Sequence, residues 1–403
     1  MNRILFLLFT FYFLINAAFS QTTIKGVIKD AQQKTPLASA SIFIANSKIG
    51  STSSANGEFT ITIPQGKYDL IISNIGYETQ FIKVDEKSTQ SLTIFLKEKQ
   101  KELDNVVIMP FEKDGWHKWG KFFTDNFIGT MDNASRCTLK NYQVIQFRNN
   151  KKRNELSAVA FEPLIIENKA LGYVLKYQME KFIYNFSSRV FYYEGYPLFT
   201  EMEGSEKDKR KWEKNREAAY YGSMLHFMRA LYRNKIAEEG FEMHKMIKKE
   251  NAEKKRVQKI VAAGKQYEDP NVDVAFVRND SSIYYEQVMK QSNELTLFYK
   301  PILPADSIAY AVDSTTAGLY FKDYVDVTYT KQKAPYEYSQ MNAQRDDHQT
   351  SQITMLDDRE VVVSSNGNYY PSQTILTSGY WGWSEKVGFM LPMDYWPEKE
   401  IKK

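Results

Sequence analysis

TTIKGVIKDAQQKTPLASASIFIANSKIGSTSSANGEFTITIPQGKYDLIISNIGYETQFIKVDEKSTQSLTIFLK, residues 22–97 of a chain of 403, is a series of short apolar or alternating runs, the pattern of β-strands. The runs are 24–28, 40–45, 58–63, 68–73, 81–84 and 92–96. Asn56-Gly57 and Pro64-Gln65-Gly66 supply tight turns, because glycine adopts positive φ without strain. Since no helical period separates the runs, the stretch predicts a small antiparallel β-sandwich of six or seven strands.

Six motifs follow one another along this stretch. They are Gly26-Val27-Ile28-Lys29-Asp30, Pro36-Leu37-Ala38-Ser39-Ala40-Ser41-Ile42, Gly50, Asn56-Gly57-Glu58-Phe59, Pro64-Gln65-Gly66-Lys67-Tyr68 and Gly76-Tyr77-Glu78. In this order and spacing, residues 21–97 resemble the carboxypeptidase regulatory-like domain. The resemblance implies a seven-stranded, transthyretin-like sandwich, found at the front of many exported and outer-membrane proteins of Gram-negative bacteria. Ser54 stands where the family often carries Asp.

The family name does not imply zinc carboxypeptidase activity, since it denotes a non-catalytic module. Zinc peptidases of that kind need a His-x-x-Glu pair and a later His. No histidine of this chain has Glu three residues after it; the histidines are His117, His226, His244 and His348. We predict no catalytic residue, no metal site and no cofactor. The resemblance leaves open a rigid spacer, a docking module or a sugar-binding surface.

Residues 1–20 predict a secretory signal. Arg3 precedes an apolar run at 4–15, and small residues at Ala18 and Ser20 offer a cleavage point before Gln21. The competing interpretation is a transmembrane anchor, which the shortness of the run disfavours. We therefore expect an exported protein in the periplasm, the outer membrane or at the cell surface.

Composition sets further limits. There are 53 basic and 49 acidic residues, and loss of Arg3 with the signal leaves 52 against 49, or +3. This near balance gives no indication of a nucleic-acid partner. The single cysteine, Cys137, excludes an internal disulfide. With 27 Tyr and 25 Phe, the chain favours a β-rich body with large buried rings.

We expect a charged linker at 98–110 and then an α+β body at 111–403, with antiparallel sheet, a few helices and a possible subdivision near 205–265. Aromatic residues at steps of three and four predict a helix within 111–131. Strands are expected across 141–202 and again beyond residue 281, whereas the polar stretch 331–347 is expected to be a loop.

The segment 206–240 is the best helical candidate. Gly222 is expected to break it and Ser223 to cap the next helix, which buries one apolar stripe. That stripe is Met224, Phe227, Met228 and Leu231. Arg229 and Arg233 lie one turn apart on another side, as candidate binding residues. Ser223 with His226 could also be a nucleophile and base, but no Gly-x-Ser-x-Gly turn or acid partner supports this.

Two other stretches invite a binding role. The basic run 245–259 fits a solvated connector, with anionic lipid contact, and thus peripheral membrane association, as the alternative. Residues 379–385, GYWGWSE, are interpreted as a strand that places Trp381 and Trp383 on one face. The two rings would either stack on a sugar or lock the C-terminal segment into the core. Glu385 is the one carboxylate that we nominate beside them.

Two functions remain. The first is a non-enzymatic envelope protein, a sandwich plus a larger body, that binds another envelope protein or a surface polysaccharide. The second is a carbohydrate-binding protein or glycan-directed hydrolase, which needs two facing carboxylates in a cleft. We favour the first, because no second carboxylate can be paired with Glu385.

Overall fold

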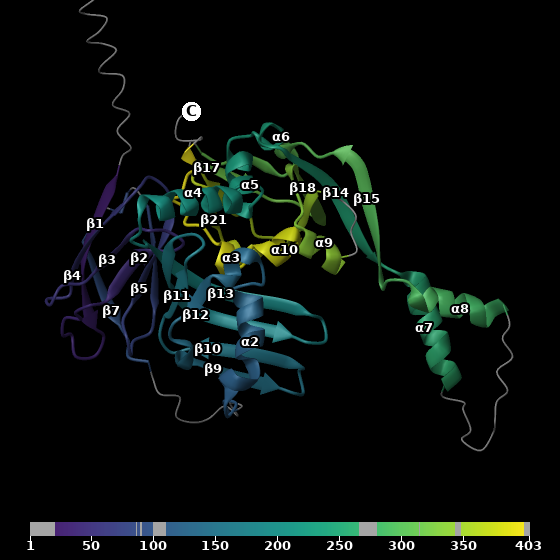
Figure 1. Cartoon of the computed structure of the whole chain (residues 1–403), viewed down its shortest axis with the longest axis horizontal. Helices are drawn as coiled ribbons and strands as arrows, with labels where there is room; N and C mark the ends of the chain where they lie inside the picture. Colours follow the sequence, from purple (N-terminus) through teal and green to yellow (C-terminus); the bar gives the residue numbers. More distant parts are fainter. Residues whose placement is uncertain are drawn as a thin grey trace, which may run out of the picture.

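The computed structural model describes residues 21–85, 87–88, 91–99, 110–265, 280–313, 315–342 and 348–398. Figure 1 shows an N-terminal sandwich, a middle sheet with α2 against it, and a C-terminal part from which a long two-stranded arm projects. The β-rich fold predicted from the sequence is confirmed. The predicted signal at 1–20 and most of the predicted linker at 98–110 lie outside the described residues, so those domain boundaries stay predictions.

The front of the chain is a sandwich of two small sheets. Its strands are β1 (Thr22–Asp30), β2 (Ser41–Ile44), β3 (Gly50–Thr52), β4 (Glu58–Ile63), β5 (Tyr68–Ser73), β6 (Gln80–Val84) and β7 (Leu92–Leu96). One sheet has the order β4-β1-β7 and the other β3-β2-β5-β6. The two sheets pack together because their strands are apolar on one side. β4, for example, buries every second residue, Phe59, Ile61 and Ile63, in the core between the sheets. One detail differs from the prediction, since β1 and β7 pair in parallel.

The middle sheet is antiparallel throughout. Its strands are β8 (Cys137–Leu139), β9 (Ile145–Asn150), β10 (Glu155–Ala160), β11 (Leu164–Asn168), β12 (Tyr173–Asn185) and β13 (Val190–Glu201), with η1 (Tyr142–Val144) before β9. α2 (Gly115–Phe127) buries Phe123 against Phe147 and Phe127 against Tyr177. α3 (Asp132–Ser135) follows. Both the predicted aromatic helix and the predicted strand series are confirmed.

Three helices connect the middle sheet to the C-terminal part: α4 (Glu206–Tyr220), α5 (Met224–Tyr232) and α6 (Ile236–Glu239). Gly222, at a φ of 83°, separates α4 from α5, because few other residues adopt that conformation without strain. Ser223 caps α5: its Oγ accepts the backbone N–H of His226 at 3.1 Å. The predicted break, cap and buried stripe are confirmed.

The C-terminal part holds two sheets with the orders β15-β14-β18-β19-β22 and β16-β17-β20-β21. Its strands are β14 (Phe241–Glu250), β15 (Glu294–Ile302), β16 (Ala309–Ala311), β17 (Thr316–Leu319), β18 (Tyr324–Lys333), β19 (His348–Met355), β20 (Val361–Ser364), β21 (Tyr369–Tyr370) and β22 (Ile375–Gly379). Its helices are α7 (Ala252–Lys265), α8 (Asp280–Lys290), α9 (Tyr336–Asn342), α10 (Tyr380–Ser384), η2 (Ala305–Ser307), η3 (Ser372–Thr374) and η4 (Val387–Phe389).

Three local predictions are wrong here. The basic run 245–259 is no connector: it forms the outer part of β14 and most of α7, since a strand with one buried side tolerates lysines on the other. The expected loop at 331–347 contains the end of β18 and α9. Residues 380–384 are helical, not extended. Gly379, at a φ of 70°, ends β22, and the Oγ of Ser351 accepts the N–H of Trp381 at 3.0 Å.

The sandwich is joined to the body by backbone hydrogen bonds. The N–H of Asn46 donates to the carbonyl of Pro197, and the N–H of Phe199 donates to the carbonyl of Ser47, both at 2.9 Å. The turn after β2 thus continues the pairing of β13. The C-terminal segment lies on the other side of this turn, where the N–H of Met393 donates to the carbonyl of Asn46 at 2.7 Å.

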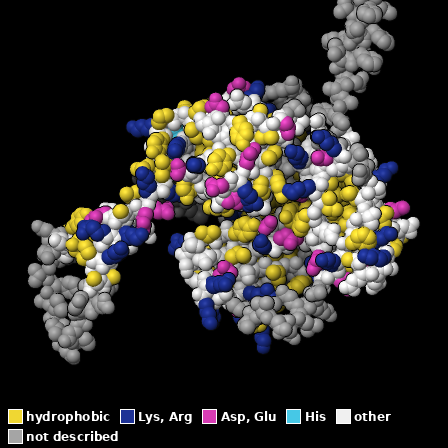
Figure 2. All heavy atoms as spheres, turned by 180° about the vertical axis from the view of Figure 1, so that it is seen from behind, with side chains coloured by type: hydrophobic (Ala, Val, Ile, Leu, Met, Phe, Trp, Pro, Cys, Tyr) yellow, Lys and Arg dark blue, Asp and Glu magenta, His cyan; other side chains and the backbone are white. Residues whose placement is uncertain are grey.

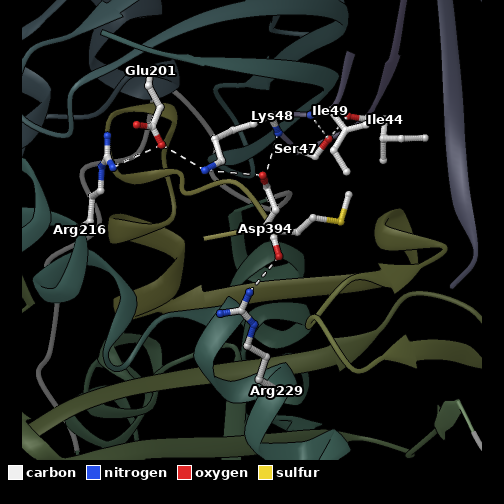
Figure 3. Close-up of polar contacts among 9 residues, drawn as sticks. Ile44, Ser47, Lys48, Ile49, Glu201, Arg216, Arg229 and Asp394 are labelled. Carbon is white, nitrogen blue, oxygen red and sulfur yellow. Dashed lines mark hydrogen bonds and ion pairs between the residues drawn. The ribbon is translucent and has the colours of Figure 1, made fainter. Parts of the chain in front are cut away.

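Ion pairs surround the same turn (Figure 3). The Nζ of Lys48 lies 3.1 Å from Glu201 and 3.8 Å from Asp394, and its backbone N–H donates to Asp394 at 3.0 Å. Arg216, from α4, lies 3.7 Å from the same Glu201 oxygen. Sandwich, middle sheet, α4 and C-terminal segment therefore meet at one network.

Candidate functional site

The arm is the most distinctive surface of the described structure. β14 pairs with β18 from Phe241 to Met246, but it pairs with β15 as far as Glu250. Beyond Met246 the two strands therefore continue without a third, and Figure 1 shows them extending away from the body to α7 and α8. At the base, Met243 and Met246 are buried, so the arm is anchored in the core.

The tip is held in place by one asparagine. The buried Asn251 caps α7, with its Oδ1 accepting the N–H of Lys254 at 3.0 Å. Its Nδ2 donates to Gln291 and to the carbonyl of Ser292, each at 3.1 Å. The two helices also bury Val257 and Val288. α7 and α8 are thus tied to the end of the hairpin.

β15 is exposed along its whole length. Its large apolar side chains are exposed by 41 to 63%; they are Leu295, Leu297, Phe298, Tyr299 and Ile302. Four more exposed apolar side chains belong to the tip: Ile260, Ile283, Tyr284 and Met289. Figure 2 shows hydrophobic side chains interspersed with basic ones along the arm, at the left of the view. β15 is also the last strand of its sheet, so one edge of its backbone has no neighbouring strand.

The five residues proposed from the sequence lie elsewhere, around α5 and the C-terminal segment. Arg229 is fully buried: its Nε donates to the carbonyl of Asn366 at 2.8 Å, and its guanidinium lies 3.6 Å from the ring centre of Trp396. Arg233 is partly buried and contacts Glu239 at 3.5 Å. Both arginines contact groups of this chain.

The two tryptophans pack internally. Trp381 is 2% exposed, its Nε1 donates to the carbonyl of Gly222 at 2.7 Å, and its ring packs on Phe227. Trp383 is partly buried beside Tyr338, with ring centres 5.3 Å apart. This geometry fits the alternative in which the two rings lock the C-terminal segment into the core, whereas stacking on a sugar needs exposed ring faces. The binding roles proposed for these residues stay predictions.

Glu385 lies at the start of α5, where its carboxylate accepts the N–H of Met224 at 2.9 Å. Burial raises the pKa of Glu385 to about 7, although the bond from Met224 and the charge of Lys386 act in the opposite direction. Burial likewise lowers the pKa of Lys386 to about 8. Glu385 therefore titrates near neutral pH inside the body, beside the first residue of α5.

Ser223 and His226 do not form a nucleophile and base. The Oγ of Ser223 accepts a backbone N–H, while the Nδ1 of His226 accepts the N–H of Gly222 at 3.1 Å. The other ring nitrogen, Nε2, lies 3.4 Å from Glu239. Burial lowers the pKa of His226 to about 4, so the ring is neutral at pH 7. The ring supports packing between α5 and β14.

Within the described residues, no group of three His, Cys, Asp or Glu side chains could hold a metal ion. No described helix has the length and apolar character needed to cross a bilayer.

Sequence reasoning found the strand at β15 but not its exposure. Leu295, Leu297 and Tyr299 occupy alternate positions of the strand, which normally indicates one buried face. The local sequence pattern does not indicate whether another element covers that face. The charged segment before the strand was one indication, because lysines are common on edge strands and rare on central strands.

Residues 24–108 match the family described as CarboxypepD_reg-like domain, so the resemblance seen in the sequence is confirmed for this part of the chain. TonB-dependent receptor P39 of Formosa agariphila is 30% identical over 108 residues, which is 27% of this chain and 10% of the receptor. TonB-dependent receptor SusC of Bacteroides thetaiotaomicron is 29% identical over 112 residues, which is 28% of this chain and 11% of the receptor. The match therefore spans about a tenth of the length of these relatives.

Among solved structures, a DUF3823 family protein from Bacteroides ovatus is 9% identical, and the match covers 46% of this chain and 82% of that one. Its TM-score is 0.16, and a likeness of that size says nothing of function.

Proposed function

We propose that this chain is an exported, non-enzymatic binding protein of the bacterial envelope, and that its arm docks with a protein of that envelope. The location is supported by the predicted signal at 1–20 and by the domain shared with two TonB-dependent receptors. Recognition of a surface polysaccharide, with or without hydrolysis, is the competing function.

The observation that carries this proposal is the exposure of β15. Contiguous exposed apolar side chains mark interaction surfaces, because leaving them in water costs free energy that a partner would recover. An unpaired strand edge is a second liability that a partner strand removes. β15 combines both, on an arm that is anchored by Met243 and Met246 at one end and by Asn251 at the other.

The polysaccharide alternative has less support from the geometry. Sugar-binding sites need exposed aromatic faces and, for hydrolysis, two facing carboxylates. Trp381 is in the core, and Glu385 is bonded to the start of α5.

A photo-crosslinking amino acid at Phe298, in the full chain and in its native cells, tests the proposal. Phe161 is the matched control, since both phenylalanines are 52% exposed but Phe161 lies outside the arm. We expect a discrete crosslinked protein product from position 298 and none from position 161. No product at position 298, the same products at both positions, or crosslinked polysaccharide in place of protein would overturn the proposal.

A further inference from the structure

The outer edge of β15 presents backbone groups in a defined order. The N–H of Asn251 donates to the carbonyl of Asn293 at 2.7 Å, which makes 251 and 293 a hydrogen-bonded pair. Opposed residues of antiparallel strands alternate between pairs with and pairs without hydrogen bonds. The next hydrogen-bonded pairs are therefore Lys249 with Leu295 and Ile247 with Leu297. Leu295 and Leu297 therefore direct their N–H and C=O groups toward β14, whereas Thr296 and Phe298 direct theirs outward.

We infer that a second copy of this chain pairs with that edge, β15 against β15 in antiparallel orientation, around a two-fold axis at Leu297. This inference rests on the proposed function and names the partner that the arm binds. In this register Thr296 faces Phe298 of the second copy, so the outward backbone groups of the two residues bond to each other. Leu297, whose own groups point inward, faces its equivalent as a pair without hydrogen bonds.

The charges of β15 select this register. With the axis at Leu297, Glu294 lies opposite Lys300 of the second copy, and the two-fold axis generates the same pair at the other end. Moving the axis to Thr296 or Phe298 places Glu294 opposite Phe298 or Ile302 and leaves both charges uncompensated. Within the described part of the chain, neither Glu294 nor Lys300 has an ion-pair partner. Opposite charges directly across two strands stabilise their pairing, and like charges destabilise it.

The side chains match on both faces of the resulting sheet. Leu295, Leu297 and Tyr299 project from one face, because alternate residues of a strand share a side. Across the axis they meet Tyr299, Leu297 and Leu295 of the second copy, which gives one continuous apolar row. The other face carries Thr296 and Phe298 between the two ion pairs. Each copy thus covers side chains that are 41 to 52% exposed in the single chain.

A bulge limits the contact. The register of β15 against β14 shifts between Met246 and His244, opposite Phe298 and Ile302, which changes the direction of the strand beyond this point. The regular alternation of outward backbone groups therefore ends near Lys300, and the pairing ends with it. Since each copy uses its single free edge once, the assembly closes as a dimer and does not extend into a fibre.

The first experiment is the mass of the full chain in solution by light scattering across a concentration series. We expect twice the mass of one chain, and L297K, which places two like charges on the axis, is expected to be a monomer at the same concentrations. E294K alone and K300E alone are each expected to raise the dissociation constant about tenfold, and the double variant E294K/K300E to restore it. All three positions are exposed in the single chain, so each variant is expected to keep the circular dichroism spectrum of the wild type, which excludes misfolding.

A cysteine crosslink tests the register directly. Residues facing each other without hydrogen bonds lie about 4.5 Å apart at Cα, close enough for a disulfide. L297C is expected to form a covalent dimer on oxidation, and F161C is expected not to. A monomeric wild-type chain, a dimer that survives L297K, or a double charge swap that fails to restore pairing would each overturn the inference. A monomer whose position 298 crosslinks to a different protein refutes self-pairing only, whereas no crosslink of any kind refutes the proposed function as well.

Discussion

The guanidinium of Arg229 donates to the carbonyl oxygen of Met393 at 2.9 Å, across 164 residues of sequence. Met393 is held from the other side by the sandwich: its N–H donates to the carbonyl of Asn46, and its side chain belongs to the core of the sandwich. One C-terminal residue, Met393, therefore connects α5 to the N-terminal domain. The arm therefore projects from a body in which the N-terminal sandwich, α5 and the C-terminal segment are linked.

R229A is expected to lower the free energy of unfolding by about 2–4 kcal/mol. The substitution leaves the carbonyls of Asn366 and Met393 without their donor and removes the cation beside Trp396. Chemical denaturation measures the change. R359A is the matched control, because the Arg359 side chain is 58% exposed and pairs with Asp357 at the surface, and it should have no measurable effect. Equal losses in the two variants would contradict this account of Arg229.

M393D is expected to separate the unfolding of the sandwich from that of the body. A carboxylate at this buried position would have no partner in the apolar core of the sandwich, which favours release of the C-terminal segment. Calorimetry should show one transition for the wild type and two for the variant. M289D, at an exposed methionine on α8, should keep the single transition. Two transitions in the wild type would show that Met393 does not couple the parts.

E385Q is expected to change how stability depends on pH. The folded pKa of Glu385 is raised to about 7 from 4.5, so between these values the folded state binds more protons and the free energy of unfolding falls as pH rises. Relative to E385Q, the wild type should lose about 3 kcal/mol between pH 4.5 and 7, since one pKa unit corresponds to about 1.4 kcal/mol.

The difference between the two proteins isolates Glu385. His226, with a pKa lowered to about 4, gives the opposite slope between pH 4 and 6.5, but it does so in both proteins. Lys386 acts only at higher pH, because its lowered pKa is about 8. Denaturant titrations at several pH values supply the measurement, and parallel pH curves for wild type and E385Q would contradict a raised pKa at Glu385.

G222A should cost more stability than G76A. Both glycines have φ near 84°, at 83° and 85°, so both variants carry the backbone strain of a side chain at positive φ, about 1 kcal/mol. A Cβ at Gly222 would lie 2.5 Å from Gln349 and 2.7 Å from Tyr329, whereas a Cβ at Gly76 meets nothing within 4 Å. We expect an additional loss of about 1–3 kcal/mol in G222A, measured by denaturation. Similar losses would mean that the surroundings of Gly222 relax freely.

The sequence by itself determined the sandwich, because its signals are local. Alternation in β4 states which residues face inward, and Asn56-Gly57 states where the chain turns, whatever lies around them. The same holds for the start of α5, where the hydroxyl of Ser223 bonds a backbone N–H three residues away. Family resemblance then identified the domain.

Only the tertiary structure decided which surfaces are free. Arg229 and Trp381 have the composition of binding residues, but both are buried by the C-terminal segment and by neighbouring elements that lie far away in sequence. Leu295, Leu297 and Tyr299 alternate as a buried strand face does, yet β15 is the outermost strand of its sheet and nothing in the described chain covers it. Burial depends on contacts between distant segments, and a periodic pattern records which face is apolar without recording what, if anything, lies against it.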